Sequence, residues 1–266
     1  MDIRTFAGLV RSLVIYRGQP WKQRRLAAFY GELLTPGDLC FDVGAHVGSR
    51  SRAMVKAGAR VVALEPQPAF LDFLRRFVRS PDIEIVGAAA GSESGRLTLH
   101  ISRRHPTVTT MSRDWIDTVG KTKAFSSVDW DEAVEVPVTT LDALIETHGL
   151  PRFCKIDVEG LEPDILAGLS QPIPIVAFEY IPEALDGARA CIDRLEALGR
   201  YRFNWVVGER HKFAEPHWLS AADMQVALTR ASANGSGDIY ARLEAADDRL
   251  SSTSAPGRAP TMLITP

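Results

Sequence analysis

The sequence predicts an α/β fold in which a mostly parallel, twisted sheet carries helices on both faces. Short segments that are apolar throughout alternate with amphipathic segments, which is typical of parallel strands buried between two helical layers. The first apolar segment runs directly into a glycine turn, as in sheets that bind a ligand at their carboxyl edge. A length of 266 residues with 45% hydrophobic residues fits one large domain of this class.

Residues 1–34 are expected to form an N-terminal helical segment. Within it, Leu26, Phe29, Tyr30 and Leu33 recur at the spacing of one helix face. A proline and a glycine then break the helix. The next five elements are expected as strand, helix, strand, helix and strand at residues 39–44, 49–57, 60–64, 69–78 and 83–89.

The alternation pauses at residues 95–138, which we interpret as a cap insertion over the sheet. This stretch is rich in loops, with short strands expected at 96–102 and 134–138. The main domain is expected over residues 35–245, followed by a disordered tail at 246–266 that is rich in Ser, Pro and Ala. In the main domain, the later strands are expected at 153–158, 175–179, 202–207 and 238–243. The later helices are expected at 161–169, at 183–198 and after Ser220.

Charge, cysteines and the N-terminus limit the partners and the compartment. The chain has 31 basic and 33 acidic side chains, so no basic surface for nucleic acid is expected. Arg11 interrupts the apolar residues near the N-terminus, and neither a signal peptide nor a transmembrane segment is expected. Cys40, Cys154 and Cys191 form no CxxC pair, which favours free buried thiols and a cytoplasmic protein.

The segment Gly44-Ala45-His46-Val47-Gly48 is the most informative turn in the chain. It follows the first strand, at the position where doubly wound sheets bind nucleosides. Glu65 lies 21 residues after Gly44, at the end of the second strand, where an acid can accept hydrogen bonds from both hydroxyls of a ribose. The alternative is a packing turn without a ligand, with Glu65 as a solvated helix cap.

The turn favours S-adenosylmethionine over a dinucleotide. A dinucleotide site uses GxGxxG, whereas this chain has His46 and Ser49 at the second and third glycine positions. S-adenosylmethionine has a ribose but no phosphate, so it tolerates the looser spacing. Asp42 is placed to meet its ammonium group, and the small side chains of Ala88 and Ala89 leave room for its adenine.

Four motifs resemble the FkbM-type methyltransferase family. They are FDVGAHVG, the LEP after the second strand, KIDVEG at 155–160 and AFEY at 177–180, and the resemblance covers roughly residues 35–245. KIDVEG followed by a helix is its most specific part. The resemblance implies a class I Rossmann-like methyltransferase fold with an antiparallel last strand, S-adenosylmethionine as cofactor, and methylation of hydroxyl groups on sugars or secondary metabolites. The family usually carries Asn where this chain has His46.

Charged residues end the strand at 153–158. An extended strand would place Lys155, Asp157 and Glu159 on one side, and charges there are costly unless a cleft uses them. The family resemblance implies that Asp157 lies beside the sulfonium and the acceptor. We therefore expect Asp157 and Glu159 to position the substrates or to act as the base. The alternative is that both acids favour the start of the next helix.

Three further residues are candidates for the acceptor side of the site. Glu179 ends a strand at the same edge of the sheet and could bind the acceptor or pair with Lys155. His105 could be the base, or part of a solvated loop. Trp115 could stack on a sugar ring, or form a small core of the cap. Asp157 and Glu179 offer too few oxygens for magnesium, so no metal is expected.

The leading hypothesis is an S-adenosylmethionine-dependent methyltransferase that acts on a hydroxyl of a small molecule or glycan. An oxidoreductase that uses NAD is the first alternative, although the glycines and a Tyr-x-x-x-Lys pair are missing. A nucleic-acid methyltransferase would have a proline-rich motif where this chain has Asp157 to Gly160. A binding protein without catalysis is the last alternative.

Overall fold

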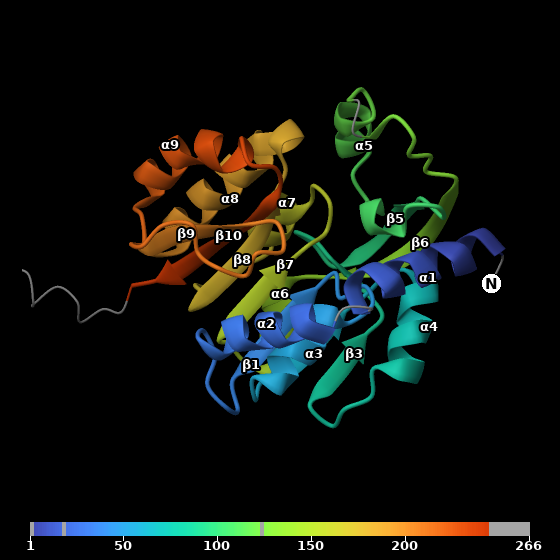
Figure 1. The fold of residues 1–266 in the computed structure, drawn as a ribbon, viewed down its shortest axis with the longest axis horizontal. Helices are drawn as coiled ribbons and strands as arrows, with labels where there is room; N and C mark the ends of the chain where they lie inside the picture. Colours follow the sequence, from blue (N-terminus) through green and yellow to red (C-terminus); the bar gives the residue numbers. More distant parts are fainter. Residues whose placement is uncertain (1–2, 18–19, 123–124, 245–266) are drawn as a thin grey trace, which may run out of the picture.

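The computed structural model describes residues 3–17, 20–122 and 125–244, and the predicted tail lies outside them. Its centre is a seven-stranded sheet with the strand order β3-β2-β1-β7-β8-β10-β9 (Figure 1). Neighbours are parallel from β3 to β8, and β10 is antiparallel to both β8 and β9. The strands are β1 (Leu39–Val43), β2 (Arg60–Leu64), β3 (Ile83–Val86), β7 (Phe153–Ile156), β8 (Ile175–Tyr180), β9 (Tyr201–Val207) and β10 (Gly237–Leu243).

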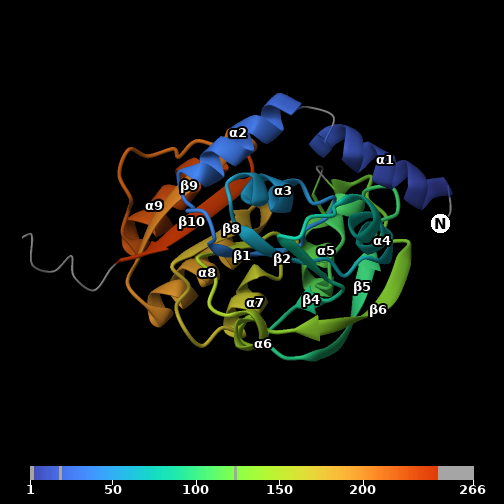
Figure 2. The same cartoon turned by 90° about the horizontal axis from the view of Figure 1, so that it is seen from below.

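Two hydrophobic cores lie on opposite faces of this sheet. One core is covered by α2 (Pro20–Gly31), α3 (Ser49–Lys56) and α4 (Pro68–Phe77). The other is covered by α6 (Leu141–His148), α7 (Glu162–Ala167), α8 (Leu185–Leu198) and α9 (Ala221–Ser232). Figure 2 shows α2 and α3 on one side of the sheet and α7 and α8 on the other. Burial on both faces explains why the sequences of the central strands are mostly apolar.

The cap contains a second sheet. Its strand order is β4-β6-β5, with β4 (Ala89–Ala90), β5 (Gly95–Ile101) and β6 (Glu132–Thr139). The predicted strand at 83–89 is therefore wrong in its second half, because β3 ends at Val86 and Ala89 pairs with β6. A 3-10 turn, η1 (Pro106–Val108), and a short helix, α5 (Arg113–Val119), connect β5 to β6. The N-terminal helix α1 (Ile3–Arg17) contacts η1 and α4.

Other differences from the sequence-based expectation are local. Helices α5 and α6 were not expected, and the helix expected at 183–198 begins as a 3-10 turn, η3 (Pro182–Ala184). Strand β7 ends at Ile156, two residues earlier than expected, so that Asp157 and Glu159 lie in a turn. Ser220 caps α9 as expected, since its hydroxyl accepts a hydrogen bond from the Asp223 N–H. Within the described ranges, no helix is both long and apolar enough to cross a bilayer.

Candidate active site

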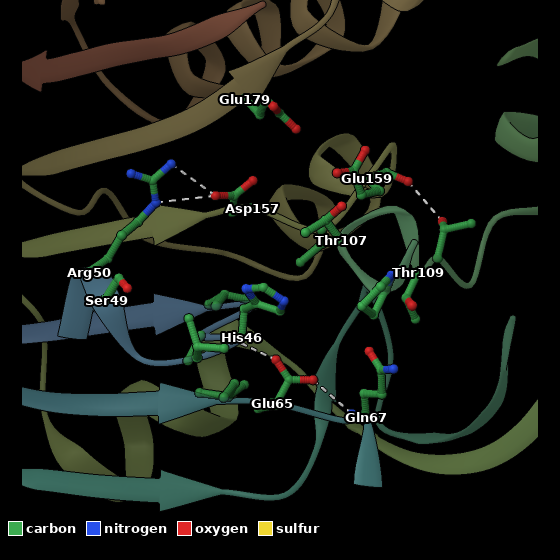
Figure 3. Close-up of a pocket in the computed structure, with 18 of the residues that line it drawn as sticks. His46, Ser49, Arg50, Glu65, Gln67, Thr107, Thr109, Asp157, Glu159 and Glu179 are labelled. Atoms are coloured by element: carbon green, nitrogen blue, oxygen red, sulfur yellow. Dashed lines mark hydrogen bonds and ion pairs between the residues drawn. The ribbon is translucent and has the colours of Figure 1, made fainter. Parts of the chain in front are cut away.

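A cavity of about 330 Å³ opens at the carboxyl edge of β1, β2, β7 and β8. Most of the residues expected to bind the cofactor line it, and Figure 3 shows the polar ones. Because the strands from β2 to β8 are parallel, their carboxyl ends meet at this edge and bring distant parts of the sequence together. The expected site residues on its wall are Gly44, Ala45, His46, Glu65, Ala88, Ala89, Asp157, Glu159 and Glu179.

Gly44 allows two strand ends to approach each other. Its φ is +86°, in the left-handed region that favours glycine. A side chain at this position would overlap the carbonyl oxygen of Asp157. Gly48 does not line the cavity; a Cβ there would lie 2.9 Å from Leu74 Cδ2, so this glycine packs α3 against α4.

Glu65 is fixed by two backbone donors. Its Oε2 accepts a hydrogen bond of 2.7 Å from the His46 N–H, and its Oε1 accepts one of 2.8 Å from the Gln67 N–H. The residue is 5% exposed. Burial raises the pKa of Glu65 to about 7, although both hydrogen bonds act in the opposite direction. The carboxyl group is thus held in one orientation on the cavity wall.

His46 and Asp42 have environments that the sequence did not indicate. Burial lowers the pKa of His46 to about 4, so its ring is neutral, and the ring lies 4.2 Å from that of Phe70 between centroids. Asp42 was expected to meet the ammonium group of the cofactor. Asp42 is fully buried beneath the cavity, is not part of its wall, and accepts a hydrogen bond from the Ser51 hydroxyl.

Asp157 belongs to a network of four charged side chains. Arg50 Nη2 lies 3.1 Å from Asp157 Oδ2, and the fully buried Lys155 Nζ lies 3.5 Å from the same oxygen. Asp238 of β10 completes the network, at 3.0 Å from Lys155 and 3.6 Å from Arg50. Burial pushes the pKa of Asp157 upward, but the charges of Lys155 and Arg50 outweigh it, and the pKa is lowered. Asp157 is therefore ionised.

The turn after Asp157 is held from both sides. Glu162 accepts hydrogen bonds from the Val158 and Gly160 N–H groups, and the Thr110 hydroxyl donates to the Glu159 carbonyl at 2.8 Å. Glu159 has a φ of +56°, which is uncommon for a residue with a side chain. This conformation separates Glu159 from the face on which Lys155 lies and directs its carboxyl group to the cavity.

Glu159 and Glu179 form the acidic end of the cavity. Burial raises the pKa of each carboxyl group well above its ordinary value. The charge of Asp157 raises the pKa of Glu159 further, and the charge of Glu159 raises that of Glu179. Among the residues described, neither carboxyl group has an ion-pair partner, so the pairing of Glu179 with Lys155 that the sequence allowed does not occur. A proton-accepting group at neutral pH requires such a raised pKa.

Two expected acceptor residues lie outside the cavity wall. Trp115 is 5% exposed and packs edge-on against Phe125 and Trp130, so the expectation that it stacks on an acceptor is corrected. Its ring covers Gly160, where a Cβ would overlap it. His105 lies beside Arg11, with Nδ1 3.1 Å from Arg11 Nη1, and its neighbours Pro106 and Thr107 line the cavity in its place.

The sequence did not reveal several residues of the wall. Arg50 follows the glycine turn and Asp238 opens the last strand, and only the sheet order brings them together. Thr107 and Thr109 come from the cap, in the segment TVTTMSRDW at 107–115, which resembles the family's polar linker but gave no site residue among the threonines. Gln67 follows the LEP motif, and its position two residues after Glu65 could have indicated a role. In the described part of the chain, no three His, Cys, Asp or Glu side chains are placed to hold a metal ion.

The fold and the cavity together define an α/β protein with a ligand-sized cavity at the carboxyl edge of its parallel strands, where sheets of this class bind nucleosides. The family described as "Methyltransferase FkbM domain" matches residues 42–249, and the chain therefore belongs to this methyltransferase family. It is an S-adenosylmethionine-dependent methyltransferase with a class I Rossmann-like fold.

Solved structures of methyltransferases are similar at low identity. The precorrin-6y C5,15-methyltransferase of Geobacter metallireducens GS-15 is 16% identical, with a TM-score of 0.44 over 82% of this chain and 86% of that one. An O-methyltransferase of Bacillus cereus, solved with SAH, is 12% identical, with a TM-score of 0.43 over 92% of each chain. A comparison with curated protein sequences gives no match.

Proposed function

We propose that this methyltransferase transfers the methyl group of S-adenosylmethionine to a hydroxyl group of a sugar, glycan or secondary metabolite. The observation that carries the proposal is the pair of carboxyl groups, Glu159 and Glu179, at the cavity end opposite Glu65. A hydroxyl oxygen must lose its proton to become a methyl ether, and a carboxylate with a raised pKa can accept that proton near pH 7.

The residues of the first three strand ends fit the nucleoside. Glu65 would accept the ribose hydroxyls, because its carboxylate is already oriented by the His46 and Gln67 N–H groups. Ala88 and Ala89 line the same wall and leave space for a flat base. Since the strands run in the order β3-β2-β1-β7-β8, the reacting end of the ligand would lie near β7 and β8.

Asp157 fits the role of a positioning charge better than that of a base. Lys155 and Arg50 keep it ionised, and a group with a lowered pKa is a weak proton acceptor. Its fixed negative charge would favour the positively charged end of the methyl donor. S-adenosylmethionine supplies an activated methyl group, so the protein mainly has to align donor and acceptor and accept a proton.

The acceptor side offers one further polar group. The buried Oγ1 of Thr109, on the cavity wall, has no hydrogen-bond partner within the described residues. An unpaired buried hydroxyl is costly, and a hydroxylated acceptor would satisfy it. The wall at this end thus combines carboxyl groups with hydroxyl groups, which suits a polyhydroxylated acceptor.

The test is a screen of acceptors with S-adenosylmethionine that carries a labelled methyl group, followed by product mass and linkage. We expect a methyl ether on a hydroxylated compound, and Glu159→Gln should lower its formation about 10²–10⁴-fold, as for loss of a general base. The exposed Glu183, from η3, provides the matched control Glu183→Gln. A product methylated on nitrogen or carbon would contradict O-methylation but not methyl transfer.

A further inference from the structure

Glu159 and Glu179 approach the same end of the cavity from different elements. Glu159 lies in the turn after β7, and Glu179 lies near the end of β8, the neighbouring parallel strand. Both side chains line the cavity and are only partly exposed. Figure 3 shows the carboxyl group of Glu179 directed toward the side of the cavity that carries Asp157 and Glu159.

The cationic side chains near the two glutamates form ion pairs with other acidic side chains. Lys155 and Arg50 are paired with Asp157 and Asp238. The charge of Lys155 lowers the pKa of each glutamate, but burial and the neighbouring acids outweigh it. The other charged groups that act on the pair, or that line the cavity near it, are Glu162 of α7 and Glu209 and His211 of the loop after β9. Glu209 and His211 pair with each other at 3.3 Å.

We propose that Glu159 and Glu179 share one proton and together receive the proton of the acceptor hydroxyl, which makes Glu179 a catalytic residue. This inference rests on the proposed function. Two carboxyl groups that line the same end of a cavity repel each other when both are charged, so they titrate as a pair. Burial, which raises both pKa values, and the charge of Glu159, which raises the pKa of Glu179 further, act in the direction that the proposal requires.

The positive charge of the methyl donor sets the protonation state of Glu159 and Glu179. The acceptor oxygen forms a bond to the methyl carbon, the carbon–sulfur bond breaks with its electron pair left on sulfur, and the hydroxyl proton moves to the glutamate pair. The donor carries a positive sulfonium, whereas the product S-adenosylhomocysteine is a neutral thioether at that atom. A nearby cation favours ionised carboxylates. Binding of the donor should therefore release the proton that the two glutamates share, whereas binding of the product should leave that proton in place.

The experiment counts protons released on binding, without any turnover. Titration calorimetry of the full chain at pH 7, in buffers with different ionisation enthalpies, gives the number of protons released per ligand. Measurements with S-adenosylmethionine and S-adenosylhomocysteine are compared. Both ligands carry the ribose, so any proton released by Glu65 cancels in the difference. We expect S-adenosylmethionine to release more protons, by about 0.3 or more per site.

Substitutions then identify the pair. In Glu179→Gln or in Glu159→Gln, the two glutamates no longer share a proton, so the difference in proton release between the two ligands should fall below about 0.1 proton. Glu183→Gln should keep the difference of the parent protein. Glu179→Gln should also lower kcat about 10–100-fold, with the affinity for S-adenosylhomocysteine changed only a few-fold, as for loss of part of a general base.

Each outcome decides between the inference and the function on which it rests. Equal proton release by the two ligands in the parent protein would overturn the shared proton and leave methyl transfer intact; this measurement depends on no variant that must fold. If folded Glu179→Gln still released more protons with S-adenosylmethionine than with S-adenosylhomocysteine, Glu179 would not belong to the pair and the proposal would be overturned. Failure of both ligands to bind would overturn the proposal together with the proposed function.

Discussion

Glu65 is a buried carboxyl group whose charge changes close to neutral pH. Its pKa is about 7 in the protein without ligand, because burial outweighs the two backbone donors. A ribose needs the ionised form, which accepts hydrogen bonds from both hydroxyls. Below pH 7, binding must first remove a proton, so we expect the affinity for S-adenosylmethionine to fall about tenfold per pH unit. Calorimetry over a pH series measures this slope.

Glu65→Gln is the matching variant for this prediction. The amide keeps the shape but removes the charge and one acceptor, so binding should weaken by roughly 1–3 kcal/mol. The loss of affinity below pH 7 should become shallower, because the proton of Glu65 is gone and only the proton released by Glu159 and Glu179 remains. A variant that keeps the pH dependence of the parent would assign the titration to another group, of which Glu159 and Glu179 are the nearest candidates.

Asp157 is predicted to matter for turnover more than for cofactor binding. Asp157→Asn removes the negative charge while keeping most of the shape, and we expect kcat to fall about 10²–10³-fold, as for loss of a preorganised charge. The dissociation constant of the cofactor should stay within a few-fold of that of the parent. Lys155 would keep only Asp238 as an anionic partner, so thermal unfolding should also occur at a lower temperature.

The turn after β1 depends on Gly44. In Gly44→Ala the new methyl group would overlap the Asp157 carbonyl, and the φ of +86° is unfavourable for alanine. We expect a cost of about 1–3 kcal/mol in the free energy of unfolding, and loss of measurable cofactor binding as β1 and β7 separate. Gly95→Ala is the control, because nothing lies within 4 Å of the added Cβ. Unfolding curves and calorimetry compare the two variants.

Trp115 acts on the catalytic turn through packing. Its ring lies on Gly160, and Ser112 caps the helix α5 that carries it. In Trp115→Phe, the smaller ring should loosen the turn that holds Glu159, so kcat should fall while the KM for the acceptor changes little. If the residue stacked on the acceptor, KM would rise instead. Steady-state kinetics with the acceptor from the screen separates the two results.

Elements with strong local signals were predictable, and elements defined by long-range pairing were not. The strands β1 and β2 are mostly apolar and lie within one residue of their predicted ends. The strand predicted at 83–89 splits because Ala89 pairs with β6, which follows far along the chain. Helix α6 was missed, although Thr140 caps it by accepting a hydrogen bond from the Ala143 N–H.

The candidate site was predictable to the same extent. Gly44 and Glu65 follow from the spacing of a single βαβ unit, and both line the cavity. Asp157 was found as a charge at a strand end, but its partners Arg50 and Asp238 depend on the order of the sheet. Glu159 was expected beside Lys155 on an extended strand, and the positive φ that turns it away has no sequence signal, since it is not a glycine.

The whole molecule should discriminate between two nucleoside cofactors. S-adenosylmethionine at about 100 times its dissociation constant should stabilise the protein by about 2.7 kcal/mol, which is visible as a thermal shift. NAD should give no shift, because His46 packs against Phe70 where a pyrophosphate would need glycine. A saturable shift with NAD in the micromolar range would support the oxidoreductase hypothesis.

The placement of β10 has a consequence for the biosynthesis of the protein. This strand is the last of the sheet in the sequence, yet it lies between β8 and β9. A nascent chain that has emerged only as far as residue 236 would expose an unpaired edge of β8, and its Lys155 ammonium group would lack Asp238. The site therefore matures only after nearly the whole described chain has left the ribosome, and until then that edge would need protection from aggregation, for example by a chaperone.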